Sequence, residues 1–514
     1  MKTQERDCMK PWLRRSAALL AAACLAACAS APGTAALEAD KPPAAQVAAP
    51  AASTDQLPVG AQALREDEAL AHYRLANGLE VIVKPDRRAP TAIHMLWVRV
   101  GSIDEADGTS GVAHALEHMM FKGSKALAPG VFSRRVAELG GQDNAFTSLD
   151  YTAYFQQVPV QQLGVVMGLE AERFAHNQWP DEEFTREIEV IKEERRLRTD
   201  DQPRAKLFEQ LMAATFMAAP QRRPIIGWMD DLQRMRAEDV RAFYRQWYVP
   251  SNAAVVVVGQ VQPRQALALV ARHYGDALQS SAQLAATLPA RKITQEPPQQ
   301  GPRRIVLRDR VEQPVLLMAF KAPALQQLQQ PTASDREALA LMALAGVLSG
   351  YEGARLERAL VRGPQRVADS VDASAMLSNR SGNGLFLLSA IPAPGRDGQA
   401  VEQALRRTIA EVAQRGVGQQ ELQRVVTQWT AATVYEQDSM FAQANELGRN
   451  WVQGWPLDAS ELLIQRLREV TPEQVQAVAA RYFGDDGLTV AELQPQAPSA
   501  AASTAPKATR KEQP

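Results

Sequence analysis

A weak internal repeat is the feature that most constrains how this 514-residue chain can fold. The segments LQRMRAEDVRAFYRQWYVPSNAAV (232–255) and LREVTPEQVQAVAARYFGDDGLTV (467–490) align without a gap, so that Leu232 falls on Leu467. A repeated pattern of this kind indicates that one structural unit occurs twice. With 46% hydrophobic residues, the chain is also large enough to bury two cores. We therefore expect two similar domains related by internal duplication.

Each half mixes strand patterns with helix patterns. The stretch NAAVVVVGQV (252–261) is an almost continuous valine run, which is typical of a strand buried on both faces of its sheet. The stretch VQQLGVVMGLEAERFAH (160–176) instead has the amphipathic pattern of a helix. In the second half, a buried strand at 315–320 and a helix at 336–348 mirror the strand at 91–102 and the helix that follows it. These patterns predict an α+β fold in both halves.

We place the two domains at 58–291 and 305–494, with KITQEPPQQGPRR (292–304) as a polar, proline-rich linker between them. The C-terminal segment 495–514 has low complexity and is predicted to be disordered. The net charge is −1, so no basic excess indicates a nucleic-acid partner.

The N-terminus has the pattern of a bacterial lipoprotein signal peptide. A basic segment precedes SAALLAAACLAA, an apolar run that is too short to span a bilayer. The run ends in Leu-Ala-Ala-Cys28, which resembles a lipobox, in which the cysteine is lipidated and becomes the mature N-terminus. We expect residues 1–28 to be removed; an ordinary cleaved signal peptide is the alternative, and Met9 could be the true start in place of Met1.

The mature chain that this predicts would be held to the membrane by its lipid alone. Residues 29–57, rich in Ala, Pro and Thr, have the composition of a flexible tether. No later run reaches the roughly 18 apolar residues that a membrane-spanning helix needs. As in lipoproteins, Ala29 after the cysteine is compatible with sorting to the outer membrane, so we expect a periplasm-facing protein.

The stretch His114-Ala-Leu-Glu117-His118 carries the chemistry. On a helix, residues three and four positions apart share a face, so both imidazoles and the carboxylate point the same way. Two imidazoles can bind zinc, and a carboxylate beside them can take a proton from metal-bound water. This inverted order is known from zinc peptidases. The alternative is a helix whose histidines only pack, although a chance match is uncommon in a chain with six histidines.

A zinc site with two histidines needs a third protein ligand. The pattern DEEFTREIEVIKEERRLRTD (181–200) predicts a helix on which Glu187 and Glu194 lie two turns apart and share a face. Because glutamate-rich helices are commonly solvated, the residues alone favour a salt-bridged surface here. The second half repeats the scaffold, but its helix at 336–348 contains no histidine, so one metal site is expected per chain.

Taken together, these segments resemble the pitrilysin/insulinase family of zinc peptidases, and most closely the bacterial peptidases similar to the mitochondrial processing peptidase. The resemblance covers about residues 70–492. It rests on HALEH followed by MMFKGS, on GGQDNAFTSLDYTAYF, on REIEVIKEE, on PIIGWMDDLQRMRAEDV with WYVPSNAAVVVVG, and on a second half without the motif. It implies two homologous αβ domains of the mitochondrial-processing-peptidase-like metallohydrolase type.

The resemblance also implies the site. One Zn²⁺ would be held by His114, His118 and Glu194, with Glu117 as the general base, and neighbouring Glu193 is the alternative to Glu194. Glu187 would orient a ligand histidine, as carboxylates behind metal ligands do.

Two further implications concern substrate and partner. Asn144 and Ala145 would lie on an edge strand that pairs with the backbone of an extended peptide. Family members supply an arginine and a tyrosine from the motif-free half, but residues 358–374 contain no tyrosine. The resemblance therefore implies a heterodimer with a paralogous subunit that lacks His-x-x-Glu-His.

The expected function is that of a zinc metalloendopeptidase acting on peptides in the periplasm. A non-catalytic scaffold or binding subunit of the same family is the alternative from another class, and it is disfavoured because the chain keeps both histidines and both glutamates. A zinc hydrolase acting on something other than peptides is a third interpretation, and the substrate-pairing strand argues against it.

Overall fold

The computed structural model describes residues 56–275, 288–291, 294–364 and 366–496. The signal peptide, the lipidation of Cys28, nearly all of the tether and nearly all of the C-terminal tail lie outside these described residues. Among the described residues, no helix is both long and apolar enough to cross a membrane.

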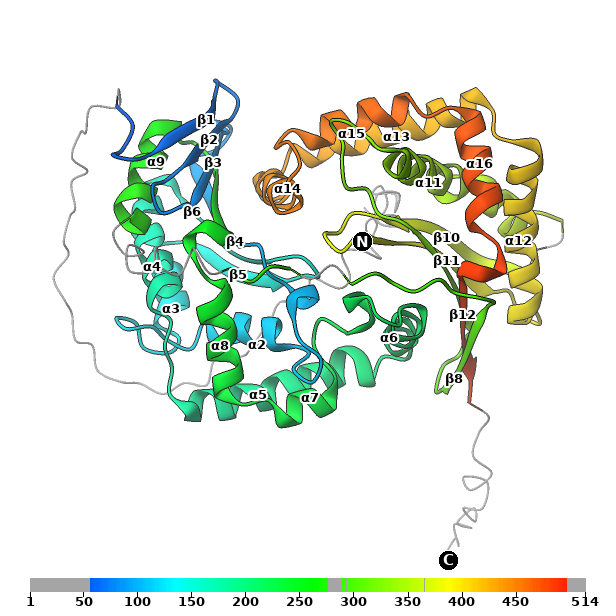
Figure 1. The fold of residues 1–514 in the computed structure, drawn as a ribbon, viewed down its shortest axis with the longest axis horizontal. Helices are drawn as coiled ribbons and strands as arrows, with labels where there is room; N and C mark the ends of the chain where they lie inside the picture. Colours follow the sequence, from blue (N-terminus) through cyan, green and yellow to red (C-terminus); the bar gives the residue numbers. More distant parts are fainter. Residues whose placement is uncertain (1–55, 276–287, 292–293, 365, 497–514) are drawn as a thin grey trace, which may run out of the picture. The chain divides into compact units, whose positions relative to one another are not determined.

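The chain forms two compact units, and neither is continuous in sequence. Unit 1 consists of Met1–Ile188, Gln233–Arg291 and Thr433–Asp458. Unit 2 consists of Glu189–Leu232, Lys292–Ala432 and Ala459–Pro514. Each unit combines one sheet with helices, so the predicted α+β class is confirmed (Figure 1).

Unit 1 is built on a seven-stranded sheet in the order β1-β2-β3-β7-β4-β6-β5. Its strands are β1 (Gln62–Glu66), β2 (Ala71–Arg74), β3 (Glu80–Pro85), β4 (Thr91–Val98), β5 (Gln142–Thr147), β6 (Thr152–Pro159) and β7 (Ala253–Gly259). The predicted valine strand, β7, is buried along its whole length between β3 and β4. Strand β5 is the last in the order and pairs with β6 alone among the described strands.

Unit 1 also contains several helices. They are α2 (Val112–Met119), α3 (Val131–Glu138), α4 (Leu163–His176), α8 (Ala237–Trp247), α9 (Pro263–Val270) and α14 (Met440–Gln453). Helix α5 (Asp181–Arg195) runs without a break across the division between the units, which falls after Ile188. The short helix α7 (Met229–Arg234) and the helix α13 (Gln419–Glu436) also cross such divisions.

Unit 2 is built on a five-stranded sheet in the order β10-β11-β9-β12-β8. Its strands are β8 (Arg303–Asp309), β9 (Val315–Pro323), β10 (Ala368–Met376), β11 (Asn383–Pro392) and β12 (Leu488–Pro495). The other helices of this unit are α6 (Pro203–Thr215), α11 (Ala333–Ser349), α12 (Gly398–Arg415), α15 (Ala459–Arg468) and α16 (Pro472–Tyr482). The repeat therefore places one sheet in each half of the sequence.

The two halves exchange one helix each. Helix α6 comes from the first half, but its Leu207 and Leu211 are buried with strand residues of unit 2 such as Leu317. Helix α14 comes from the second half, but Leu447 and Trp451 are buried with strand residues of the unit 1 sheet. Because α6 and α14 occupy nearly equivalent places in the repeat, the exchange is reciprocal. The sequence predicts the duplication, whereas the exchange is a finding of the structure.

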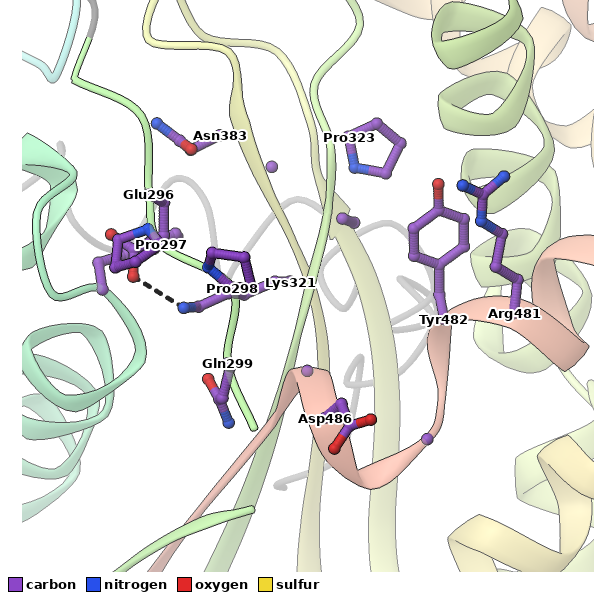
Figure 2. Close-up of a pocket in the computed structure, with 15 residues that line it drawn as sticks. Glu296, Pro297, Pro298, Gln299, Lys321, Pro323, Asn383, Arg481, Tyr482 and Asp486 are labelled. Carbon is purple, nitrogen blue, oxygen red and sulfur yellow. Dashed lines mark hydrogen bonds and ion pairs between the residues drawn. The ribbon is translucent and has the colours of Figure 1, made fainter. Parts of the chain in front are cut away.

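The described part of the predicted linker is fixed to unit 2. The Glu296 carboxylate accepts hydrogen bonds from the backbone N–H groups of residues 217–219 and from Lys321 Nζ at 2.7 Å. Figure 2 shows this ion pair beside Pro297 and Pro298. Gln299 Nε2 donates to the carbonyl of Leu488 at 2.7 Å. These hydrogen bonds hold the described part of the polar linker against unit 2.

A chain of polar side chains is buried between α4 and the unit 1 sheet. Tyr274 Oη donates to His94 Nε2 at 3.1 Å, and His94 Nδ1 donates to Gln156 Oε1 at 2.8 Å. Gln156 Nε2 donates in turn to Glu170, which forms a buried ion pair with Arg173 at 2.6 Å. Burial lowers the pKa of His94, which keeps the ring neutral, as one donating and one accepting nitrogen require.

Candidate metal centre

Helix α2 begins in a position fixed by glycine and by a buried carboxylate. Gly111 has φ 87°, a left-handed conformation that favours glycine. Glu105 accepts hydrogen bonds from the N–H groups of Gly111 and Ala113, both at 3.0 Å, so it satisfies donors that a helix start leaves unpaired. The negative charge of Glu105 also interacts favourably with the positive N-terminal end of the helix dipole.

The two histidines of α2 lie side by side. The ring centroids of His114 and His118 are 4.7 Å apart, and the rings are inclined at 71°. His114, His118 and Glu194 each offer a ligand atom, and these atoms all lie within 4.8 Å of one another. Two imidazole nitrogens and one carboxylate oxygen are a donor set that catalytic zinc sites use, so the residues present fit Zn²⁺.

Helix α5 brings Glu187 to the back of His118. His118 Nδ1 lies 2.8 Å from Glu187 Oε1, and Lys122 Nζ lies 2.5 Å from Glu187 Oε2. A proton shared through Nδ1 leaves Nε2 as the nitrogen that can bind a metal. Burial raises the pKa of Glu187, but hydrogen bonds from His118 and Lys122 lower it by more, so the net shift of the pKa is downward.

Glu194, rather than Glu193, joins the two histidines. The Glu194 side chain is 13% exposed and pairs with Arg198 Nη1 at 2.6 Å. The Glu193 side chain is 58% exposed and pairs with Arg196. Because Glu187 and Glu194 lie on one continuous helix, two turns apart, the same element supplies a candidate ligand and the partner of another.

Glu117 projects from α2 beside the last residue of β5. Its Oε2 accepts a hydrogen bond from the Thr147 hydroxyl. Glu117 lies outside the group of candidate ligands among the described residues. The strand thus holds a carboxylate that comes from the same helix as both histidines, and this carboxylate is suited to proton transfer.

The two predicted substrate residues lie on the edge of the sheet. Asn144 and Ala145 face Phe155 and Tyr154 of β6, and β5 is the outermost strand on that side. The Ala145 N–H donates to Asn144 Oδ1 at 2.8 Å. An edge strand of this kind can accept an added strand through its backbone groups.

Segment 358–374, which lacks the expected tyrosine, contains arginines that form ion pairs. Arg362 pairs with Glu352 at 2.7 Å and with Glu357 at 2.9 Å. Arg366 pairs with Asp369 at 2.5 Å. Both arginines are thus engaged with acidic residues of their own unit.

Two residues of the site were not predicted. Lys122 follows His118 by four residues, just past the end of α2, so its spacing could have suggested a partner for a carboxylate behind the metal group. Thr147 carries no such signal, because nothing in the sequence tells which side chain of β5 faces α2.

Comparisons with known proteins find related sequences over both halves of the chain. A family model described as "Insulinase (Peptidase family M16)" matches residues 80–228, and one described as "Peptidase M16 inactive domain" matches residues 234–429. The chain is 29% identical to zinc protease PqqE of Helicobacter pylori over 429 residues, which cover 82% of this chain and 92% of that protein. It is 28% identical to an uncharacterized zinc protease of Mycobacterium leprae, over 79% of this chain and 87% of that protein.

Solved structures show the same fold. The crystal structure of a protease from Helicobacter pylori superposes with a TM-score of 0.75 at 27% identity, covering 83% of this chain and 100% of that one. The first half of the periplasmic protease PqqL from Escherichia coli superposes with a TM-score of 0.69 at 21% identity, covering 84% of this chain and 93% of that one.

Proposed function

Because this chain belongs to the insulinase family of peptidases, we propose that it is a zinc metalloendopeptidase that hydrolyses peptides or unfolded polypeptides in the bacterial periplasm. The observation that carries the proposal is the convergence of His114, His118 and Glu194 beside Glu117. A non-catalytic scaffold would not need this complete set, so the catalytic function is favoured.

Each residue has a role in the proposed reaction. When bound, Zn²⁺ would act as a Lewis acid on water and on the scissile carbonyl. Glu117 takes a proton from water and later delivers it to the leaving amine. Glu187 keeps the His118 ring oriented, with Lys122 holding the other oxygen of its carboxylate. The edge of β5 aligns an extended substrate through backbone hydrogen bonds.

The variant Glu117→Gln tests the proposal directly. It removes the proton acceptor but no candidate ligand, so zinc content should stay at one per chain while peptide hydrolysis is abolished. Glu138→Gln is a matched control, because the Glu138 side chain is 58% exposed and lies on α3, outside the candidate site. Full peptidase activity in the Glu117→Gln chain would refute the assignment of the base.

We also propose that the active form is a heterodimer with a paralogue lacking His-x-x-Glu-His. The support is the segment 358–374, which has no tyrosine and whose arginines are paired with acidic residues. Peptide cleavage should rise strongly when such a paralogue is added to the purified chain. Full activity of the chain as a monomer, measured across a gel-filtration peak, would contradict the heterodimer.

The proposed location is the periplasmic face of the outer membrane, with Cys28 as the lipid attachment. The lipobox-like sequence supports this location, and so does the similarity to a protease described as periplasmic. The variant Cys28→Ala should leave the membrane fraction and lose labelling by radioactive palmitate. A variant that stayed in the outer-membrane fraction would exclude the anchor.

A further inference from the structure

Thr147 is the last residue of β5, and its hydroxyl reaches the carboxylate of Glu117. The residue is buried, with 8% of its surface exposed. Side chains alternate along a strand, so Ala145 and Thr147 share one face of β5 and Phe146 lies on the other. Phe146 packs against Trp97 and Phe441 on that opposite face. The register of β5 therefore turns Thr147 toward α2.

A hydroxyl in this position limits what the carboxylate can do. The Thr147 hydroxyl can donate one hydrogen bond, and it donates this bond to Glu117 Oε2. The bond holds one rotamer of a side chain that must stay within hydrogen-bonding reach of the attacking water.

We propose that Thr147 is a positioning residue for the general base: its hydroxyl orients the Glu117 carboxylate and connects it to the edge strand that binds substrate. This inference rests on the proposed function. Because Thr147 and the substrate-pairing residues belong to one strand, a peptide that pairs with β5 is placed in register with the base. A displacement of about 1 Å at such a group can cost about 100-fold in rate.

Two substitutions separate this role from simple packing. Thr147→Val keeps the branched shape but removes the donor, and Thr147→Ser keeps the donor but removes a methyl group. Thr152 provides a matched control, because it lies directly opposite Thr147 in the sheet and its buried hydroxyl donates to the carbonyl of Val100 at 3.1 Å. Thr152→Val therefore loses a buried hydroxyl of the same kind without touching Glu117.

Peptide hydrolysis gives the first readout. With the zinc-loaded chain and its partner subunit, Thr147→Val should lower kcat about 10- to 100-fold with little change in KM, because the base acts in the transition state. Thr147→Ser and Thr152→Val should keep kcat within a few-fold of the original chain. An unchanged kcat in Thr147→Val, with the original chain active, would overturn this inference and leave the proposed function intact.

Binding of acetohydroxamate to the zinc-loaded chain gives a second readout that needs no turnover. A hydroxamate bound to zinc can donate a hydrogen bond to a carboxylate beside the metal, so calorimetry should show about 10-fold weaker binding in Thr147→Val and in Glu117→Gln. Equal affinity in Thr147→Val and the original chain would overturn the inference even if the chain cleaved no peptide. A chain that binds no zinc would overturn both the proposed function and the inference.

Discussion

Replacing Gly448 by alanine would test the helix exchange, because this glycine is where α14 meets the sheet of unit 1. A Cβ atom at Gly448 would lie less than 3.0 Å from three atoms of the Trp97 indole. Trp97 is fully buried on β4 and packs against Phe146 and Tyr151, with ring centroids 5.8 and 4.8 Å away. The indole therefore has no space into which it can withdraw.

The expected cost follows from two opposing effects. Overpacking a well-filled core costs about 1–3 kcal/mol, and a clash with a rigid ring belongs at the upper end of that range. Alanine in the middle of a helix gains about 1 kcal/mol over glycine. The net loss of unfolding free energy is then about 2 kcal/mol, which corresponds to a Tm lower by about 4–8 °C for a domain of this size.

Differential scanning calorimetry of the purified chain would measure this change. Gly164→Ala on α4 is the matched control, because its new Cβ would meet only the flexible end of Leu269 at 3.3 Å. The control should keep or slightly raise Tm. Since Phe146 lies on β5 next to Thr147, Gly448→Ala should also lower peptidase activity below the transition. A Gly448→Ala chain as stable as the control would refute the packing of α14 against Trp97.

Three further predictions follow from other parts of the structure. Glu194→Gln should lose zinc on dialysis against a weak chelator, whereas the exposed neighbour Glu193→Gln should retain it; equal zinc content would refute the choice of ligand. Glu170→Ala should lower the unfolding free energy by about 3–5 kcal/mol, because it leaves Arg173 as a buried unpaired charge, and urea unfolding would measure this. Burial raises the pKa of Glu296, but its hydrogen bonds lower it by more, to about 2 from 4.5, so its stabilisation should be present above pH 4.5 and lost as pH falls toward 2. Glu296→Gln should therefore be less stable at pH 7, and its deficit should shrink in acid; a deficit independent of pH in urea unfolding would contradict this.

Most of the fold and of the metal group could be predicted from the sequence, because both depend on local patterns. The valine run predicted β7, and the histidine spacing placed two imidazoles on one face of α2. Glu194 was harder, because a glutamate-rich helix has the same pattern whether it faces solvent or a metal. Only the resemblance to a family singled it out, and the structure then brought it to the histidines while Glu193 stayed exposed.

The exchange of α6 and α14 could not be predicted in the same way. An amphipathic pattern tells that a helix buries one face, but it does not tell which of two similar sheets receives that face. The contact of Thr147 with Glu117 could not be predicted from the sequence for a related reason. It depends on the register of β5 against β6, and a shift of one residue would turn every side chain of the strand to the other face.

Helix α11 shows what the position of α2 becomes when it carries no candidate metal ligands. Each follows a buried strand of its own sheet, β4 before α2 and β9 before α11. Helix α2 has eight residues, three of which are polar; His118 is paired with Glu187, and Glu117 accepts a hydrogen bond from Thr147. Helix α11 has 17 residues and is buried continuously from Ala338 to Leu348, with no charged group in that stretch. Burying polar groups is costly unless they are paired, so a copy without ligands is free to extend its apolar surface. The three polar side chains of α2 are therefore explained by its site rather than by the fold, because the same fold accepts a longer helix with an uncharged, buried stretch in the other half.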